Sequence, residues 1–146
     1  MTVLHEYASR GETAKLEKAL QYSSTAKLIT KPIGNGFLPI HSAASSGNID
    51  CIKVLLESGS DINSRTTCNG EDRTPLMISA MNGCVDALSF LLDVGADINS
   101  EDAEGNTALR WAIKKNQTAV VSILLHRGAK KPTIPHELEK LREMGF

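Results

Sequence analysis

The chain has 146 residues, of which 41% are hydrophobic and only 4% aromatic, and its formal net charge is -1 with a pI near 6.4. This length suits one domain whose core is built mainly from leucine, isoleucine, valine and alanine, and the charge lacks the broad positive field of a nucleic-acid-binding protein. The sequence has no apolar run of about 18 residues and no basic, apolar leader, which disfavours a transmembrane helix and a secretory signal.

Cysteine usage points to a reducing environment. The three cysteines, Cys51, Cys68 and Cys84, have no regular spacing, and their number is odd. Such a set argues against a disulfide framework. We therefore expect a cytoplasmic or nuclear protein, and the sequence does not choose between the two compartments.

Four segments of similar pattern follow one another along the chain. They begin at Thr2, Leu38, Thr74 and Thr107, so their starts are separated by 36, 36 and 33 residues. The third segment reads TPLMISAMNGCVDALSFLL and continues as DVGADINS. A period of this length predicts a repeat protein, in which stacked copies bury an apolar face that one copy cannot bury alone.

The third copy has the pattern of two short helices. Thr74 is a suitable N-cap, and Pro75 fits the first helical position, where its missing N–H has no intrahelical partner to lose. Gly83 suits the left-handed turn that ends a helix. A second helix is expected from about Val85 to Asp93, with its leucines on one stripe. The same interpretation applies to residues 39–58 and 108–127.

The motifs TPL, LPIH and GADIN, repeated at this period, resemble the ankyrin repeat family over nearly the whole chain. The resemblance implies an all-α ankyrin-repeat solenoid of stacked helix-turn-helix units with β-hairpin fingers, capped at both ends. We expect a single domain over residues 1–146. The expected repeats span about residues 1–35, 36–68, 69–103 and 104–131, followed by a C-terminal capping helix in residues 132–146.

Both ends of the chain depart from the repeat. In the first copy Lys15 and Lys18 replace apolar residues of the later copies, which places charge on an outward face. At the other end Pro132 and Pro135 interrupt the chain, and residues 136–144 have the pattern of a short amphipathic helix. Two such caps are what a complete small protein would carry.

The stretch IHSAASSGNIDC (40–51) contains the residue types of a catalytic site, but its position in the repeat favours a structural role. His41 aligns with His5, Met77 and Arg110, so no pattern of repeated histidines exists. The resemblance implies that His41 forms hydrogen bonds within and between neighbouring repeats. The chain also lacks the ligand spacings of zinc and calcium sites and the lysine of a phosphate-binding loop. We expect no metal, no cofactor and no enzyme activity.

Two features allow more than one interpretation. Trp111, the only tryptophan, either packs against the third copy near Ile78 or is an exposed anchor for a partner. Asn63 and Asn99 fit the turns of the fingers. The resemblance also leaves open the hydroxylation of these asparagines by an oxygenase.

The resemblance implies a rigid scaffold that binds a protein through the concave surface of its fingers and first helices. We expect a monomeric adaptor or inhibitor, with an assembly chaperone or a structural subunit of a larger complex as the alternative, and with no nucleic-acid or membrane partner. Phe37, Arg73 and Met81 are expected to contact the partner, and an acidic part of it is expected to face Lys114 and Lys115. The candidate binding residues are Ser9, Arg10, Phe37, Ser45, Ser46, Arg73, Met81, Asn82, Ala103, Glu104, Asn106, Lys114 and Lys115.

Overall fold

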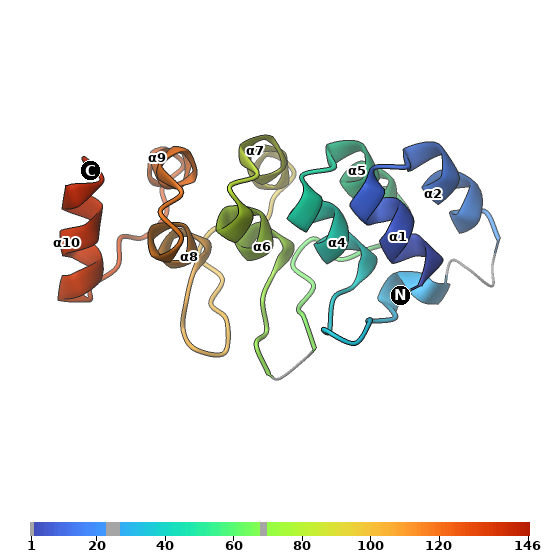
Figure 1. Ribbon diagram of the computed structural model, residues 1–146, viewed down its shortest axis with the longest axis horizontal. Helices are drawn as coiled ribbons and strands as arrows, with labels where there is room; N and C mark the ends of the chain where they lie inside the picture. Colours follow the sequence, from blue (N-terminus) through green and yellow to red (C-terminus); the bar gives the residue numbers. More distant parts are fainter. Residues whose placement is uncertain (1, 23–26, 68–69) are drawn as a thin grey trace.

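The protein forms a row of antiparallel helix pairs that ends in a single helix (Figure 1). The structure is a computed structural model that describes residues 2–22, 27–67 and 70–146. Its helices are α1 (Val3–Arg10), α2 (Thr13–Leu20), the 3-10 helix η1 (Lys27–Thr30), α4 (Pro39–Ser46), α5 (Ile49–Glu57), α6 (Pro75–Asn82), α7 (Val85–Asp93), α8 (Ala108–Lys114), α9 (Thr118–His126) and α10 (Pro135–Glu143).

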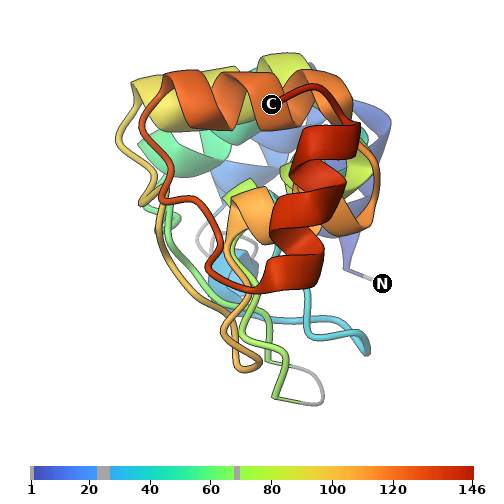
Figure 2. The ribbon, with the colours of Figure 1, turned by 90° about the vertical axis from the view of Figure 1, so that its left-hand side faces the viewer.

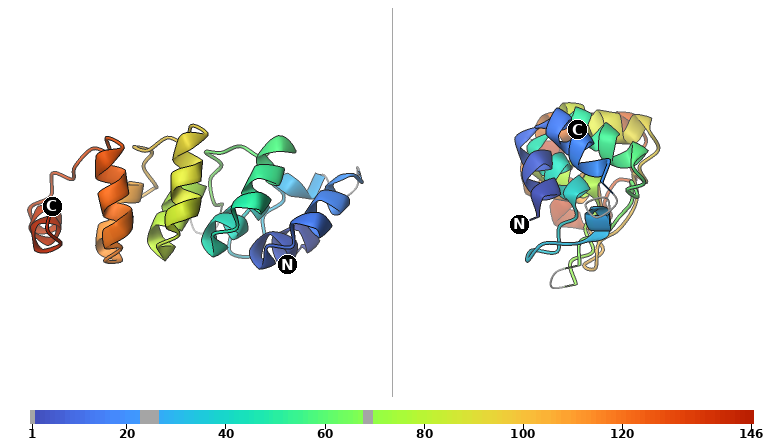
Figure 3. Two further views of the ribbon diagram at one scale, coloured as in Figure 1. Left: turned by 90° about the horizontal axis from the view of Figure 1, so that it is seen from above. Right: turned by 90° about the vertical axis from the view of Figure 1, so that its right-hand side faces the viewer.

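The pairs stack so that the first helices, α1, α4, α6 and α8, form one layer and the second helices, α2, α5, α7 and α9, form another (Figures 1 and 3). The loops between the pairs project to one side of the row (Figure 2). We call these loops finger 1 (residues 31–38), finger 2 (residues 60–67 and 70–73) and finger 3 (residues 96–106).

The third pair shows why this sequence forms short helices. The Oγ1 atom of Thr74 accepts a hydrogen bond from the backbone N–H of Met77 (3.3 Å), and Pro75 is the first residue of α6. Gly83 ends α6 with a φ of 70°, a left-handed conformation that glycine adopts without strain. The predicted N-cap, the glycine turn and the second helix, Val85–Asp93, are therefore confirmed.

The core runs along the whole stack and uses the same positions in each copy. Aliphatic side chains at these positions are at most 1% exposed, as stacking of incomplete units requires. In the first helices they are Leu4, Ile40, Leu76 and Leu109, and in the second helices Leu16, Ile52, Leu88 and Val121.

The fingers differ from the predicted β-hairpins, because the described residues contain no strand. One backbone hydrogen bond spans the base of finger 2, from Thr66 N–H to the carbonyl of Arg73 (2.9 Å). Other backbone groups bond between neighbouring loops instead, such as Ala103 N–H to the carbonyl of Glu71 (3.2 Å). Some of the backbone groups that a strand ladder would pair thus form side-by-side contacts between fingers instead.

Helix α10 closes the C-terminal end of the row, where it lies against α8 (Figure 2). Its Leu141 is 3% exposed, and its Glu137 accepts hydrogen bonds at both carboxylate oxygens from Arg110 Nε (3.0 and 2.9 Å). The predicted capping helix is therefore present. At the other end, Lys15 and Lys18 are exposed as expected.

Candidate functional site

The ends of the first helices occupy equivalent places in the stack, and many of the predicted binding residues lie there. Arg10, Ser46, Asn82, Lys114 and Lys115 are exposed, whereas Ser9, Ser45 and Met81 are half-buried. The structure thus places these residues along one edge of the first-helix layer, which Figure 1 shows as a row of helices.

Hydrogen bonds from the next repeat fix the ends of the first helices α1, α4 and α6. The residue that precedes α5, α7 or α9 donates a hydrogen bond to a backbone carbonyl of the preceding repeat, and no sequence motif had marked this contact. The bonds run from Asn48 Nδ2 to Ala8 (2.8 Å) and Ser9 (3.0 Å), from Cys84 Sγ to Ser45 (3.6 Å), and from Gln117 Nε2 to Met81 (3.2 Å).

Ser45 belongs to such a joint, although we expected it to face a partner together with Ser46. Its hydroxyl accepts a hydrogen bond from Asn82 Nδ2 (2.9 Å), and the same amide lies 3.2 Å from the Ser45 carbonyl. Ser46, by contrast, is exposed. Ser45 and Asn82 therefore link two repeats, and Ser46 is the more accessible of the two serines.

Two cationic side chains lie over the indole ring of Trp111. The guanidinium carbon of Arg73 is 4.6 Å and Lys114 Nζ is 5.0 Å from the ring centroid, both within the range of a cation–π interaction. Trp111 Nε1 donates to Asp102 Oδ2 (2.8 Å), and Lys114 Nζ donates to Asn106 Oδ1 (2.6 Å). We call these five residues the Trp111 platform; they join finger 3 to α8 and to the base of α6.

Asp102 organises finger 3. Its Oδ1 accepts hydrogen bonds from the backbone N–H groups of Glu104 (3.0 Å) and Asn106 (2.8 Å). Burial raises the pKa of this carboxyl group, but hydrogen bonds from Asn106, Trp111 and Glu104 more than offset burial and leave the pKa below its ordinary value. The carboxylate is thus ionised at neutral pH and holds the turn closed.

Asn106 corrects one prediction, and Asp102 has a structural role that the sequence had not suggested. Asn106 is only 1% exposed, because its side chain reaches Asp102 and Lys114 instead of solvent. The signal for Asp102 was available as an aspartate four residues before Asn106 in a glycine-containing turn, where a carboxylate commonly binds backbone N–H groups ahead of it. Ala103 and Glu104, at the tip of finger 3, are exposed as expected.

Trp111 lies between the two degrees of burial that its two interpretations predict. The side chain is half-buried and packs at the edge of the core, yet the residue retains some exposure. An anchor of this kind would already be ordered before a partner arrives, so binding would require little loss of side-chain freedom.

Removing the Arg73 guanidinium should open the indole ring to solvent. We expect Arg73→Ala to increase acrylamide quenching of Trp111 fluorescence and to lower the free energy of unfolding by about 1 kcal/mol, the scale of a cation–π pair. Lys115→Ala is the matched control, since Lys115 is exposed and is not among the cations over the ring. Equal quenching in the two variants would show that Arg73 does not cover Trp111.

Phe37 lies in finger 1, Arg73 in finger 2 and Met81 in α6. The half-buried ring of Phe37 lies 5.7 Å from the ring of His41, centroid to centroid. Arg73 precedes α6, whereas Met81 is near the other end of that helix, and eight helical residues span about 12 Å. Of the three, Arg73 is the one that contacts Trp111, and Met81 is half-buried near the end of α6.

His5 and His41 link neighbouring segments of the stack. His41 Nδ1 accepts from the backbone N–H of Leu38 (3.0 Å), and its Nε2 donates to the carbonyl of Ser64 (3.1 Å). The Nε2 atom of His5 likewise lies 2.8 Å from a backbone carbonyl, that of Phe37, whereas its Nδ1 bonds to the hydroxyl of Thr2. With both ring nitrogens occupied and the residue fully buried, His41 has no nitrogen left to act as a catalytic base.

The asparagines at the finger turns also bond to the following repeat. Asn63 Oδ1 accepts from the backbone N–H of Asp97 (3.0 Å), and Asn99 Oδ1 accepts from that of Lys130 (2.9 Å). These bonds support the structural interpretation of both residues. Cys51 and Cys84 are free thiols, and Cys68 lies outside the described residues.

A metal-binding cluster and a membrane-spanning helix are both absent from residues 2–22, 27–67 and 70–146. No group of three or more histidine, cysteine, aspartate or glutamate side chains could hold a metal ion. None of the helices in that part of the chain has the length and apolar character that crossing a membrane requires.

Stacked helix pairs with projecting loops and bonded joints define a helical repeat protein of the solenoid class. The family model described as "Ankyrin repeats (3 copies)" matches residues 1–66 and again residues 65–134. The chain therefore belongs to the ankyrin repeat family. No curated protein matched the chain in a sequence search. Ankyrin repeats are generally protein–protein interaction modules and are typically non-enzymatic.

Proposed function

We propose that the protein is a non-enzymatic adaptor or inhibitor that binds a protein partner through its fingers and first helices, with the Trp111 platform at the centre. The observation that carries this proposal is the pair of cations, Arg73 and Lys114, over a half-buried tryptophan. Tryptophan and arginine are the residue types most enriched at binding hot spots.

Charge on this surface favours a partner with an acidic segment. Lys114 Nζ is bonded to the neutral amide of Asn106, and Lys115 is exposed on the next residue. Among the residues that the structure describes, no carboxylate forms an ion pair with either lysine. An acidic segment of the partner would supply this missing charge and would raise the rate of association at low ionic strength.

The proposal is tested by reversing the two charges. We expect the immobilised wild-type protein to retain a specific set of proteins from a cell extract, identified by mass spectrometry, and Lys114→Glu/Lys115→Glu to lose that set. Lys27→Glu/Lys31→Glu is the matched control, because both of these lysines are exposed near the opposite end of the row and the net charge changes equally. Retention of the same proteins by all three samples would contradict the proposal.

A further inference from the structure

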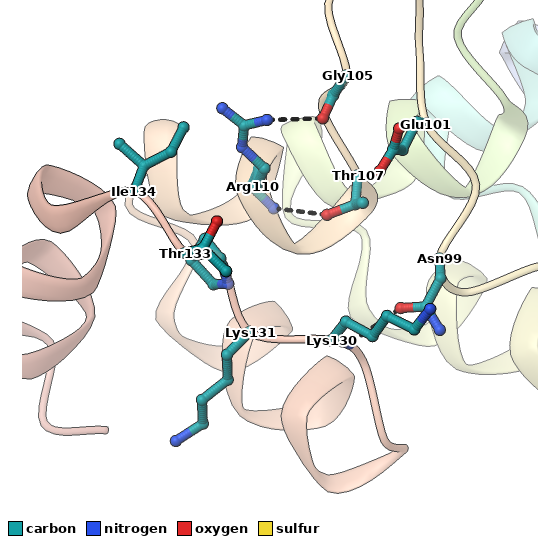
Figure 4. Close-up of a pocket in the computed structure, with 10 residues that line it drawn as sticks. Asn99, Glu101, Gly105, Thr107, Arg110, Lys130, Lys131, Thr133 and Ile134 are labelled. Carbon is teal, nitrogen blue, oxygen red and sulfur yellow. Dashed lines mark hydrogen bonds between the residues drawn. The ribbon is translucent and has the colours of Figure 1, made fainter.

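A narrow cleft lies between finger 3 and the linker that leads from α9 to α10. Figure 4 shows the cleft with Glu101, Thr107 and Gly105 on one side, Thr133 and Ile134 on the other, and Arg110 between them. The volume of the cleft is about 270 Å³. We call it the slot, and we call residues 130–134 the linker.

The slot occupies the place where one more finger would stack. Finger 3 attaches to finger 2 through Asp97 N–H, which donates to Asn63 Oδ1, and then through Ala103 N–H, which donates to Glu71. Lys130, 33 residues after Asp97, repeats the first contact by donating its N–H to Asn99 Oδ1. The linker then turns into α10 at Pro135, so the second contact has no counterpart on the outer side of finger 3.

The linker has backbone groups available for a new contact. It contains no helix or strand, and Ile134 has extended backbone angles (φ -75°, ψ 125°). Within the described chain, no hydrogen-bond acceptor pairs with the backbone N–H groups of Lys131, Thr133 and Ile134. An extended segment in the slot could therefore pair with the linker through main-chain hydrogen bonds, as a strand does when it adds to an exposed edge.

The side chains of the slot favour an acidic occupant. Lys130 and Lys131 are exposed and form no ion pair with a described residue, whereas Arg110 is already neutralised by Glu137. Glu101 is the one carboxylate in the lining, so the unpaired groups carry two positive charges and one negative charge. This local excess of positive charge contrasts with the net charge of -1 of the whole chain.

We propose that the slot binds an extended, acidic segment of a partner protein, which takes the place of the next finger and whose carboxylates lie within reach of the long side chains of Lys130 and Lys131, which point to different sides of the linker (Figure 4). Ile134, 43% exposed at the rim, would contact an apolar side chain of the segment. That the segment belongs to a partner protein rests on the proposed function. The slot is a separate site from the Trp111 platform, so binding at the slot can be disproved without disproving binding at the platform.

The probe is a fluorescein-labelled peptide of five Glu-Val repeats, which alternates acidic and apolar side chains when extended. Fluorescence anisotropy should show that it binds the wild-type protein and that Lys130→Glu/Lys131→Glu binds it at least about tenfold more weakly. Lys27→Glu/Lys31→Glu should bind it as the wild type does. Glu101→Gln should bind it more tightly, because it removes the one opposing charge, and a peptide of five Lys-Val repeats should not bind.

Amide NMR spectra locate the bound peptide. The signals of Gly105, Thr133 and Ile134 should shift on titration, whereas the indole N–H signal of Trp111 should not. The inference is overturned if the Glu-Val peptide does not bind, if Lys130→Glu/Lys131→Glu binds it as well as the wild type, or if the shifts centre on Trp111. The first two results would not contradict the proposed role of the Trp111 platform, because that site is tested separately with Lys114→Glu/Lys115→Glu.

Discussion

Replacement of Leu88 by alanine is expected to lower the free energy of unfolding by about 2–5 kcal/mol. Leu88 is fully buried in α7, which packs between α5 and α9, so truncation leaves a cavity that neighbouring repeats can fill only in part. A loss of this size is a large fraction of the stability of a small domain, about 5–15 kcal/mol. Urea denaturation followed by circular dichroism measures the change.

Leu92→Ala is the matched control for this prediction, because it removes the same atoms from the same helix. Leu92 is only half-buried, so less apolar surface is lost from the core, and the destabilisation should be clearly smaller. Equal losses for the two variants would show that burial in the stack does not determine the stability of this helix.

Acidification from pH 7 to pH 5 should destabilise the protein by about 2 kcal/mol through His41. Burial lowers the pKa of His41 from 6.5 to about 4, although the hydrogen bond to the Ser64 carbonyl acts in the opposite direction. Below pH 6.5, His41 takes up a proton in the unfolded chain but stays neutral in the folded chain. The contribution of His41 to the free energy of unfolding is therefore fully present above pH 6.5 and is lost as the pH falls towards 4.

Geometry gives the same sign for this effect. A proton on His41 Nδ1 would face the N–H of Leu38, so two donors would meet where one bond now exists. Burial also lowers the pKa of His5, so His5 adds to the loss of stability on acidification. The lowered pKa of Asp102 affects stability only when the pH falls below the ordinary aspartate pKa of 3.8.

Denaturant unfolding at pH 7 and pH 5 tests the assignment. His41→Gln should be less stable than the wild type at pH 7 but should lose less stability between the two pH values. His136→Gln, a change at an exposed histidine in α10, should keep the wild-type pH dependence. A pH dependence unaltered by His41→Gln would assign the effect to other groups.

The sequence was sufficient for the paired helices, because local signals and the repeated pattern delimit them, whereas it had not suggested the 3-10 helix η1. The start of α6 is marked by Thr74 and Pro75, and its end is marked by Gly83. The spacing of apolar residues in each copy determines which helix face is buried. The shape of the fingers was less predictable. Some of their backbone hydrogen bonds go to a neighbouring loop about 30 residues away, as from Ala103 to Glu71, and local sequence does not report such a partner.

The repeat pattern predicted which positions lie on the expected binding surface, but it predicted the exposure of their side chains only in part. Equivalence between repeats places Lys114 and Lys115 on the surface correctly, but it also placed Asn106 there, where the ionised Asp102 draws the amide inward. Likewise, Arg73 and Trp111 come from different repeats, and only stacking brings the guanidinium over the ring. Contacts that depend on two repeats at once are what a single copy of the motif cannot reveal.

The single-helix closure of the stack has a dynamic consequence. An inner helix such as α6 has neighbouring helices on both sides, whereas α10 packs against α8 at one end of the row. Local opening should therefore be easiest at α10, and its amide hydrogens should exchange faster than those of α6. Because α10 and the linker are continuous at Pro135, a segment held in the slot would slow exchange in α10 without contacting it.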